Sequence, residues 1–219
     1  MSMGDDFVPA ARAREIVAAS VESLVDGFQQ VRPGVWVEQG EVEVRRVVSL
    51  DAWKGANLTI GYGISCAWIP IRYGKRASFH WPRTLKQASM HLWVDHFVND
   101  APAQRSISRL VGERKLQRDA QQAAKEAAKT SRTWWSRVAD PAGVLTEARR
   151  QASNEHDIHW PSGSFVAAFT LARLGNLDAA REALRSTKQA DNWSEELSSN
   201  LDNALADVAA RALAKAPQK

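Results

Sequence analysis

The sequence predicts an α+β protein in which an N-terminal helix packs on a small, mainly antiparallel sheet, followed by a C-terminal helical region. Three observations predict this class: helical spacing of apolar residues near the N-terminus, period-two alternation in the next part of the chain, and helix start and stop signals beyond it. We expect an α+β sheet domain at 1–99, a long basic helix and the helix after it at 100–152, and a helical hairpin region at 153–219. We expect that last region to pack as one unit with the rest.

The N-terminal helix is expected over about 9–27. Apolar residues between Val17 and Phe28 recur at the spacing of one helical face. Pro9 suits the first turn of a helix, because proline has no backbone N–H to leave unpaired there.

Two strands are expected after this helix, at 35–38 and 41–50. Gln39 and Gly40 stand between them as a hairpin signal. In the second strand the valines at even positions share one face, which indicates an amphipathic strand. The segment 83–98 fits both a strand and a helix, and we favour a strand.

The sharpest strand pattern runs from Leu58 to Trp68, where large side chains alternate with small ones. The small positions include Gly61 and Gly63. Glycine weakens a strand, so its presence indicates that something approaches that face closely. We expect a helix to pack on the glycine face, and the alternative is a ligand lying on the backbone.

Beyond the sheet the chain looks helical. Asp100 and Pro102 form a start signal, as do Asp140 and Pro141, and Gly175 is a stop signal. The helices are expected at about 100–129, 140–151, 164–174, 177–187 and 194–214, with a polar loop at 153–163.

Composition limits the class of protein. The net charge is +4, and Cys66 is the single cysteine, which excludes an internal disulfide or a cysteine-based zinc site. Asp5 and Asp6 precede any apolar run, which is the wrong order for a secretory signal. The most apolar stretch, 58–71, is too short and too broken by glycine and proline to cross a bilayer. We therefore expect a cytoplasmic protein.

The basic residues concentrate in the middle of the chain, where 52–94 contains six basic residues and no acidic one. Between 71 and 86 they interleave with aromatic residues, a mixture that suits single-stranded nucleic acid. The alternative is a solvated loop whose aromatic residues turn into the core. The candidate binding residues are Arg72, Tyr73, Lys75, Arg76, Trp81 and Arg83, joined by Arg105 and Arg109 further along the chain.

Trp134 and Trp135 are two further candidates, because tryptophan is enriched at protein interfaces. Adjacent side chains on a helix point about 100° apart. We expect one of the two to be a contact residue, and the alternative is that helices pack on both sides.

The sequence contains few motifs that indicate a catalytic site or a metal site. The loop with Glu155, His156, Asp157 and His159 has side chains that suit zinc, but it lacks the helical histidine pair that would fix a geometry, so we expect no metal there. Cys66 falls on the large apolar face of its strand and is expected to be inert. The chain has no nucleophile elbow, phosphate-binding loop or dinucleotide fingerprint. We expect no cofactor.

The order of elements in the first 100 residues resembles a known family. A helix, Asp26-Gly27-Phe28, Trp36, a strand with Arg45-Arg46 and then LTIGYGI at 58–64 are similar to bacterial domain-of-unknown-function family 4304. The resemblance implies the fold and assigns no catalytic residue. The segment 169–184 resembles one tetratricopeptide-type helical hairpin, and a single hairpin does not make a peptide-binding solenoid.

From these observations we expect a non-enzymatic binding protein that recognises a macromolecular partner, in the manner of bacterial immunity or defence-associated proteins. The expected partner is another protein. Two alternatives stay open: a nucleic-acid-binding protein that uses the basic middle, and an enzyme with a site near His156 and His159.

Overall fold

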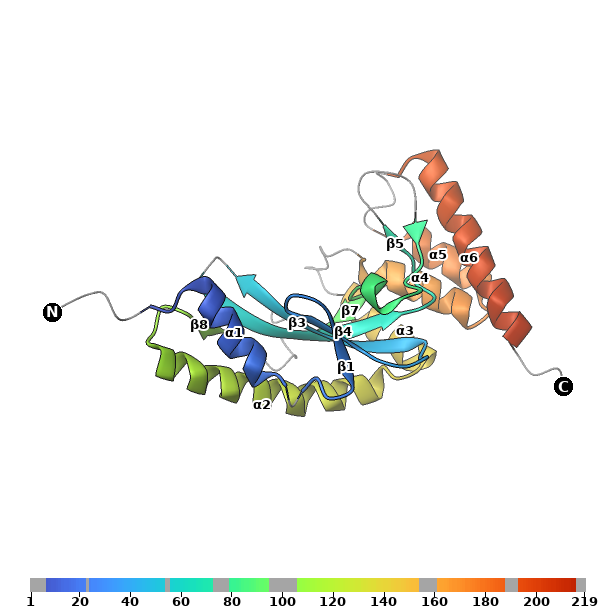
Figure 1. Cartoon of the computed structure of the whole chain (residues 1–219). Helices are drawn as coiled ribbons and strands as arrows, with labels where there is room; N and C mark the ends of the chain where they lie inside the picture. Colours follow the sequence, from blue (N-terminus) through green and yellow to red (C-terminus); the bar gives the residue numbers. More distant parts are fainter. Residues whose placement is uncertain are drawn as a thin grey trace. The chain divides into compact units, whose positions relative to one another are not determined.

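The computed structural model (Figure 1) describes residues 7–22, 24–53, 56–72, 79–94, 106–153, 161–187 and 193–215. An N-terminal helix, an antiparallel sheet and a helical region follow one another, so the predicted α+β class is confirmed.

The chain divides into two compact units. Unit 1 holds the described residues of 1–41, 45–63 and 93–136, and unit 2 holds those of 42–44, 64–92 and 137–219. These boundaries differ from the three consecutive segments expected from the sequence. The physical reason is that one long strand, β4 (Asn57–Cys66), contributes its first part to unit 1 and its last residues to unit 2.

The main sheet has the strand order β1-β2-β3-β4-β7, and β8 also pairs with β4. The pairs β1 with β2, β2 with β3, and β4 with β8 are antiparallel, and β5 and β6 form a separate antiparallel pair. Besides β4, the bounds are β1 Phe28–Arg32, β2 Val35–Glu38, β3 Val44–Trp53, β5 Ile71–Arg72, β6 Phe79–His80, β7 Leu92–Trp93 and β8 Ile107–Ser108.

The first helix, α1 (Ala10–Ser20), ends earlier than predicted. Gly27 has φ +76°, in the left-handed region that a right-handed helix cannot use, and Phe28 already belongs to β1. The helix predicted to residue 27 is therefore wrong in its last turns. Val21 and Leu24 fit the helical spacing and are buried, but they lie in the turns that follow the helix. The spacing of apolar residues therefore extended the predicted helix too far.

The strand predicted at 35–38 is confirmed, whereas the next one begins at Val44 and continues to Trp53. Its predicted alternation is wrong: Val47 and Val48 are both buried, and Val42 is exposed before the strand begins. A strand covered on both faces loses the period-two pattern.

The strand favoured at 83–98 is wrong for the part that the structure describes. Leu85–Gln87 is a short 3-10 helix, and only Leu92–Trp93 is strand. The local cause is a capping arrangement, in which the backbone N–H of Thr84 donates to Oε1 of Gln87 at 3.2 Å and the backbone N–H of Gln87 donates to the carbonyl of Thr84 at 3.1 Å.

Helix α2 (Glu113–Arg137) packs on β4 through aromatic side chains. The ring of Tyr62 meets Trp134 and Trp135 edge to face, with centroids 6.1 and 6.0 Å apart. The Tyr62 hydroxyl donates to Oγ1 of Thr130 at 3.1 Å, and Nε1 of Trp135 donates to the carbonyl of Gly63 at 3.0 Å. The contact therefore combines apolar burial with two directional hydrogen bonds.

Two expectations about this helix are corrected. It begins at Glu113, after the short strand β8, and the predicted start at Asp100 lies outside the described residues. Trp134 and Trp135 are both buried, 3% and 6% exposed, so neither is an exposed contact residue. The second covering surface comes from β1 and β3, because Phe28 packs on Trp135 and the guanidinium of Arg46 lies 5.5 Å from its ring centroid.

The glycine face of β4 has neighbours other than those expected. A Cβ at Gly61 would lie 2.7 Å from Oγ of Ser49 and 2.9 Å from Oδ2 of Asp51, two β3 side chains that hydrogen-bond each other at 2.7 Å. Since successive strand residues point to opposite faces, α2 covers the Tyr62 face and not this one. Gly61 makes room for a polar pair on the neighbouring strand.

Four helices of unit 2 lie within two residues of the predicted ranges: α3 Pro141–Ala152, α4 Gly163–Arg173, α5 Leu177–Arg185 and α6 Glu195–Lys215. Asp140, Ser162 and Asn176 cap the N-termini of α3, α4 and α5, and Gly175 ends α4 with φ +82°, as predicted.

Helix α4 is the centre of this group and packs against α3, α5 and α6. Its residues from Phe165 to Ala172 are all buried. At Gly163 an added Cβ would lie 2.4 Å from the backbone nitrogen of Ala152, so α3 and α4 approach closely there. None of the helices in the described part of the chain combines the length and apolar composition needed to cross a membrane.

Replacing Gly61 with alanine should reduce the free energy of unfolding by about 1 kcal/mol, because the new methyl group displaces the hydrogen bond between Ser49 and Asp51. Gly112→Ala is the matched control, since nothing lies within 4 Å of the position its Cβ would occupy. Urea unfolding of both variants measures the difference. Equal stability of Gly61→Ala and wild type would contradict the prediction.

Candidate binding site

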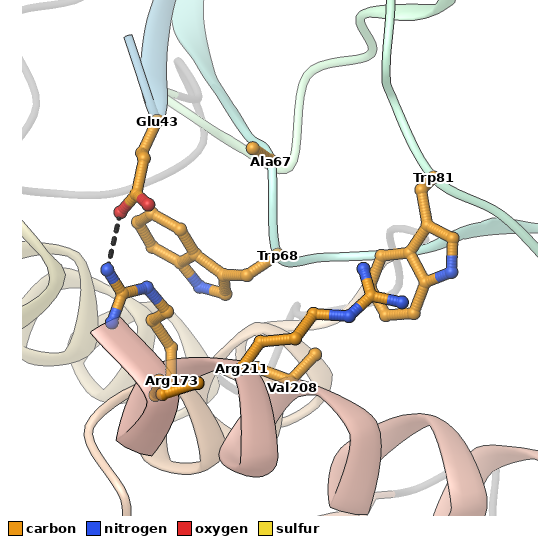
Figure 2. A pocket seen from close by; sticks show the side chains of 9 residues that line it. Glu43, Ala67, Trp68, Trp81, Arg173, Val208 and Arg211 are labelled. Carbon is orange, nitrogen blue, oxygen red and sulfur yellow. Dashed lines mark hydrogen bonds and ion pairs between the residues drawn. The ribbon is translucent and has the colours of Figure 1, made fainter. Parts of the chain in front are cut away.

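Unit 2 contains a cavity of about 400 Å³ that collects side chains from distant parts of the chain (Figure 2). Its walls come from the residue before β3, the turn after β4, the segment after β6, the end of α4 and the last turns of α6. The lining residues are Glu43, Ala67, Trp68, Trp81, Arg173, Val208, Arg211, Ala212 and Ala214. We call this cavity the tryptophan pocket.

One wall of the tryptophan pocket is built around Trp68, which is 5% exposed. Its Nε1 donates to Oγ1 of Thr170 at 3.2 Å, and this fixes the indole against α4. The guanidinium of Arg173 lies 6.0 Å from the Trp68 ring centroid and donates to Oε2 of Glu43 at 2.7 Å. The backbone N–H of Ala67 donates to the carbonyl of Glu43 at 2.8 Å, so both ends of Glu43 are held.

The other wall is built around Trp81, which is half-buried. Its ring meets Phe169 edge to face, with centroids 6.3 Å apart. The guanidinium of Arg211, on an exposed position of α6, lies 5.8 Å from the Trp81 ring centroid. Figure 2 shows the Arg211 side chain reaching from α6 toward this indole.

The charges in the pocket do not cancel. Arg173 is paired with Glu43, whereas Arg211 forms no ion pair with any residue that the structure describes. The described lining therefore carries one surplus positive charge beside two indole rings. Such a site favours an occupant with apolar surface and a negative group.

The end of β4, just before Trp68, is held by a buried histidine. The backbone N–H of Cys66 donates to Nδ1 of His91 at 2.8 Å, and the backbone N–H of His91 donates to the carbonyl of Ile64 at 2.8 Å. Burial lowers the pKa of His91 to about 3, so its imidazole is neutral at pH 7. Nδ1 accepts a hydrogen bond, so the remaining ring proton is on Nε2.

Cys66 is fully buried, and burial raises the pKa of its thiol above the ordinary range. The thiolate is the nucleophilic form of cysteine, and a thiol with a raised pKa forms little of it. The burial of Cys66 is therefore consistent with an unreactive thiol.

Of the ten candidate binding residues from the sequence, Trp81 lines the tryptophan pocket. Arg83 is exposed in unit 2, and Arg109 is half-buried in unit 1 with its guanidinium 5.3 Å from the Phe7 ring centroid. Arg72 lies in β5, and Trp134 and Trp135 are buried against Tyr62. Tyr73, Lys75, Arg76 and Arg105 lie outside the described residues.

Four residues of the pocket were not predicted from the sequence: Glu43, Trp68, Arg173 and Arg211. One signal was available for the two arginines. Arg173 ends a largely apolar helix, and Arg211 is the one arginine of an alanine-rich helix. The described residues hold no group of three His, Cys, Asp or Glu side chains that could bind a metal ion. The loop with Glu155, His156, Asp157 and His159 lies outside them.

Comparison of the chain with protein-family models, with curated proteins and with solved structures gave no match. The resemblance of the first 100 residues to domain-of-unknown-function family 4304 therefore stays a prediction.

The buried His91 should make stability depend on pH. In the unfolded chain its imidazole takes up a proton below about pH 6.5, whereas in the folded protein it does so only near pH 3. The unfolded state then binds more protons between these values, so stability falls as the pH is lowered, by about 1.4 kcal/mol per pH unit from this group.

His91→Asn removes the titrating group while an amide oxygen can still accept from Cys66, so its unfolding free energy should fall less steeply between pH 6 and 4 than that of wild type. Replacing the exposed His80 with asparagine is the matched control for loss of an imidazole. Urea unfolding across this pH range measures the effect. Parallel pH profiles for His91→Asn and wild type would contradict it.

Proposed function

We propose that the protein is a binding protein that recognises another protein by accepting a segment of it in the tryptophan pocket. The observation that carries the proposal is the pair of indole rings, Trp68 and Trp81, each with a guanidinium within about 6 Å of its ring centroid. Tryptophan and arginine are the side chains most enriched among residues that dominate the energy of protein interfaces.

The size and chemistry of the pocket define the segment. A cavity of about 400 Å³ lies in the range of sites that bury a compact group. Val208 and the alanines of α6 add apolar surface. Arg211 offers a planar set of N–H donors that suits a carboxylate. We infer that the bound segment places an apolar side chain between the indoles and an aspartate, a glutamate or a terminal carboxylate beside Arg211.

The same side chains favour binding over acid–base catalysis. The titratable groups of the described lining are Glu43, Arg173 and Arg211. Glu43 is held by Arg173, and a guanidinium stays protonated at all physiological pH values. The described lining therefore contains no pair of groups that could exchange a proton near neutral pH.

Several parts of the expectation from the sequence remain predictions within this proposal: the bacterial source, the cytoplasmic location and a role in immunity or defence. The alternative of an enzyme with a site near His156 and His159 concerns residues outside the described ones.

Charge reversal at Arg211 tests the proposal. Arg211→Glu should weaken partner binding by about 2 kcal/mol, or roughly thirtyfold in Kd, because a hydrogen-bonded charge is lost and a repulsive one is added. Arg211 is exposed on α6, so the fold should persist, which a thermal melt checks. Arg149→Glu, an exposed charge reversal on α3 outside the pocket, is the matched control.

The partner is first captured from the native host with the wild-type protein and identified by mass spectrometry. Purified partner is then titrated against wild type, Arg211→Glu and Arg149→Glu by calorimetry. We expect wild type and Arg149→Glu to bind alike. A partner protein that binds Arg211→Glu as tightly as wild type would show that the tryptophan pocket is not its site.

A further inference from the structure

Helix α2 carries a row of basic side chains along its solvent side. Five residues form the row, separated by four, seven, four and three positions, which are spacings that keep side chains on one helical face. They are Arg114, Arg118, Lys125, Lys129 and Arg132, and all five are exposed. We call this row the basic ridge.

The basic ridge lies opposite the buried face of the same helix. Leu116, Ala120, Ala123, Ala127 and Trp134 form the core of that buried face. At about 100° per residue, their mean direction lies roughly 180° from that of the ridge. The packing of α2 on β4 therefore holds the ridge toward solvent.

The acidic residues of α2 stand away from the ridge and have other partners. Glu113 pairs with Arg12 on α1, and Asp119 pairs with Lys115 at 2.8 Å. Glu126 accepts a hydrogen bond from Gln122 at 2.7 Å. The remaining positions along the line of the ridge are Gln121 and Ser136, which carry no charge.

The ridge charges are not neutralised by the residues that the structure describes. None of the five forms an ion pair with another residue in the described ranges. Like charges four positions apart, as at 114 and 118 or 125 and 129, destabilise a helix. The row is therefore not explained by helix stability, and it creates a linear positive field that favours a linear negative partner.

We propose that the basic ridge docks on the phosphate backbone of a nucleic-acid duplex, as a second binding surface independent of the tryptophan pocket. The ridge spans eighteen residue steps from Arg114 to Arg132, or about 27 Å at 1.5 Å per residue. A duplex advances about 3.4 Å per base pair, so this length faces roughly eight base pairs.

The side chains of the ridge favour a duplex over other anionic partners. Single strands are held largely by stacking on exposed aromatic rings, whereas the tryptophans of α2 are buried against Tyr62. A protein interface needs a buried apolar or aromatic anchor, and the ridge offers none among its five side chains. A membrane-surface helix inserts its apolar face, but that face of α2 is already buried within the protein.

The chemistry of this contact determines how binding behaves. Phosphate contacts position a protein without reading sequence, so binding should be independent of base order. Each neutralised phosphate releases condensed counterions, so the logarithm of the binding constant should fall with the logarithm of salt concentration by about 0.9 per contact.

The test measures fluorescence anisotropy of a labelled DNA duplex of roughly 20 base pairs, and of an RNA duplex of the same sequence, over a range of salt concentrations. The ridge variant is Arg118→Gln with Lys125→Gln and Lys129→Gln, since glutamine keeps helix propensity. The control variant is Arg14→Gln with Arg149→Gln and Arg185→Gln, three exposed positions on α1, α3 and α5 that change the net charge equally.

We expect wild type and the control variant to bind duplex with a steep salt dependence. The ridge variant should lose about tenfold in affinity per lost contact at 50 mM salt, and its salt slope should be smaller in magnitude by about 2.7. Arg211→Glu should keep the wild-type salt slope, which separates this proposal from that for the tryptophan pocket.

Four outcomes would overturn the proposal. The first is that wild type shows no salt-dependent binding to the duplex, and the second is that the ridge and control variants weaken equally, which indicates a net-charge effect. The third is that a single strand of the same length binds more tightly than the duplex. The fourth is that polyglutamate binds wild type as tightly as the duplex does and does not bind the ridge variant, which indicates an acidic protein partner.

Discussion

The burial of strand β4 on both faces is the constraint on which both candidate surfaces depend. From Leu58 to Cys66 every residue of the strand is buried, although large and small side chains alternate along it. The large face receives α2 through Tyr62, and the small face leaves room for the Ser49–Asp51 pair on β3. Where the strand ends, His91 holds the backbone of Cys66, and two residues later Trp68 begins one wall of the pocket. In unit 1 the strand receives a helix, and in unit 2 its last residues lead into a wall of the pocket.

The packing of the tryptophans of helix α2 determines which of its side chains are exposed. Its two adjacent tryptophans are both buried because Tyr62 receives both indoles and Phe28 and Arg46 add further contacts to Trp135. Because both tryptophans are buried, a wide part of the helix circumference faces the protein interior. This fixes the rotation of α2 about its own axis. Once that rotation is set, the cations at helical spacing lie on the exposed side of the helix. The stability of the aromatic contact and the exposure of the basic ridge therefore have the same cause.

The two proposed surfaces use arginine in different ways. In the tryptophan pocket Arg173 and Arg211 lie over indole rings, where their guanidinium planes complement an aromatic face and a carboxylate together. The basic ridge combines three arginines with two lysines, and none of the five lies over an aromatic ring of the residues that the structure describes, which suits repeated, sequence-independent charge neutralisation. The first arrangement selects a particular chemical group, and the second suits the regularly spaced phosphates of a duplex. Salt should therefore weaken the ridge contact much more than the pocket contact.

Local signals in the sequence determined the α+β class, the strand at 35–38 and the helices of unit 2. A capping residue such as Asp140 or a left-handed glycine such as Gly175 acts within one turn of the chain, so its effect is visible in sequence. The burial of both tryptophans depended on neighbours far along the chain. The tryptophan pocket joins Glu43 to Arg211, and the exposure of the basic ridge follows from contacts with β4. Tertiary structure alone decided these features, because they depend on which distant side chains meet, and residue spacing does not encode that.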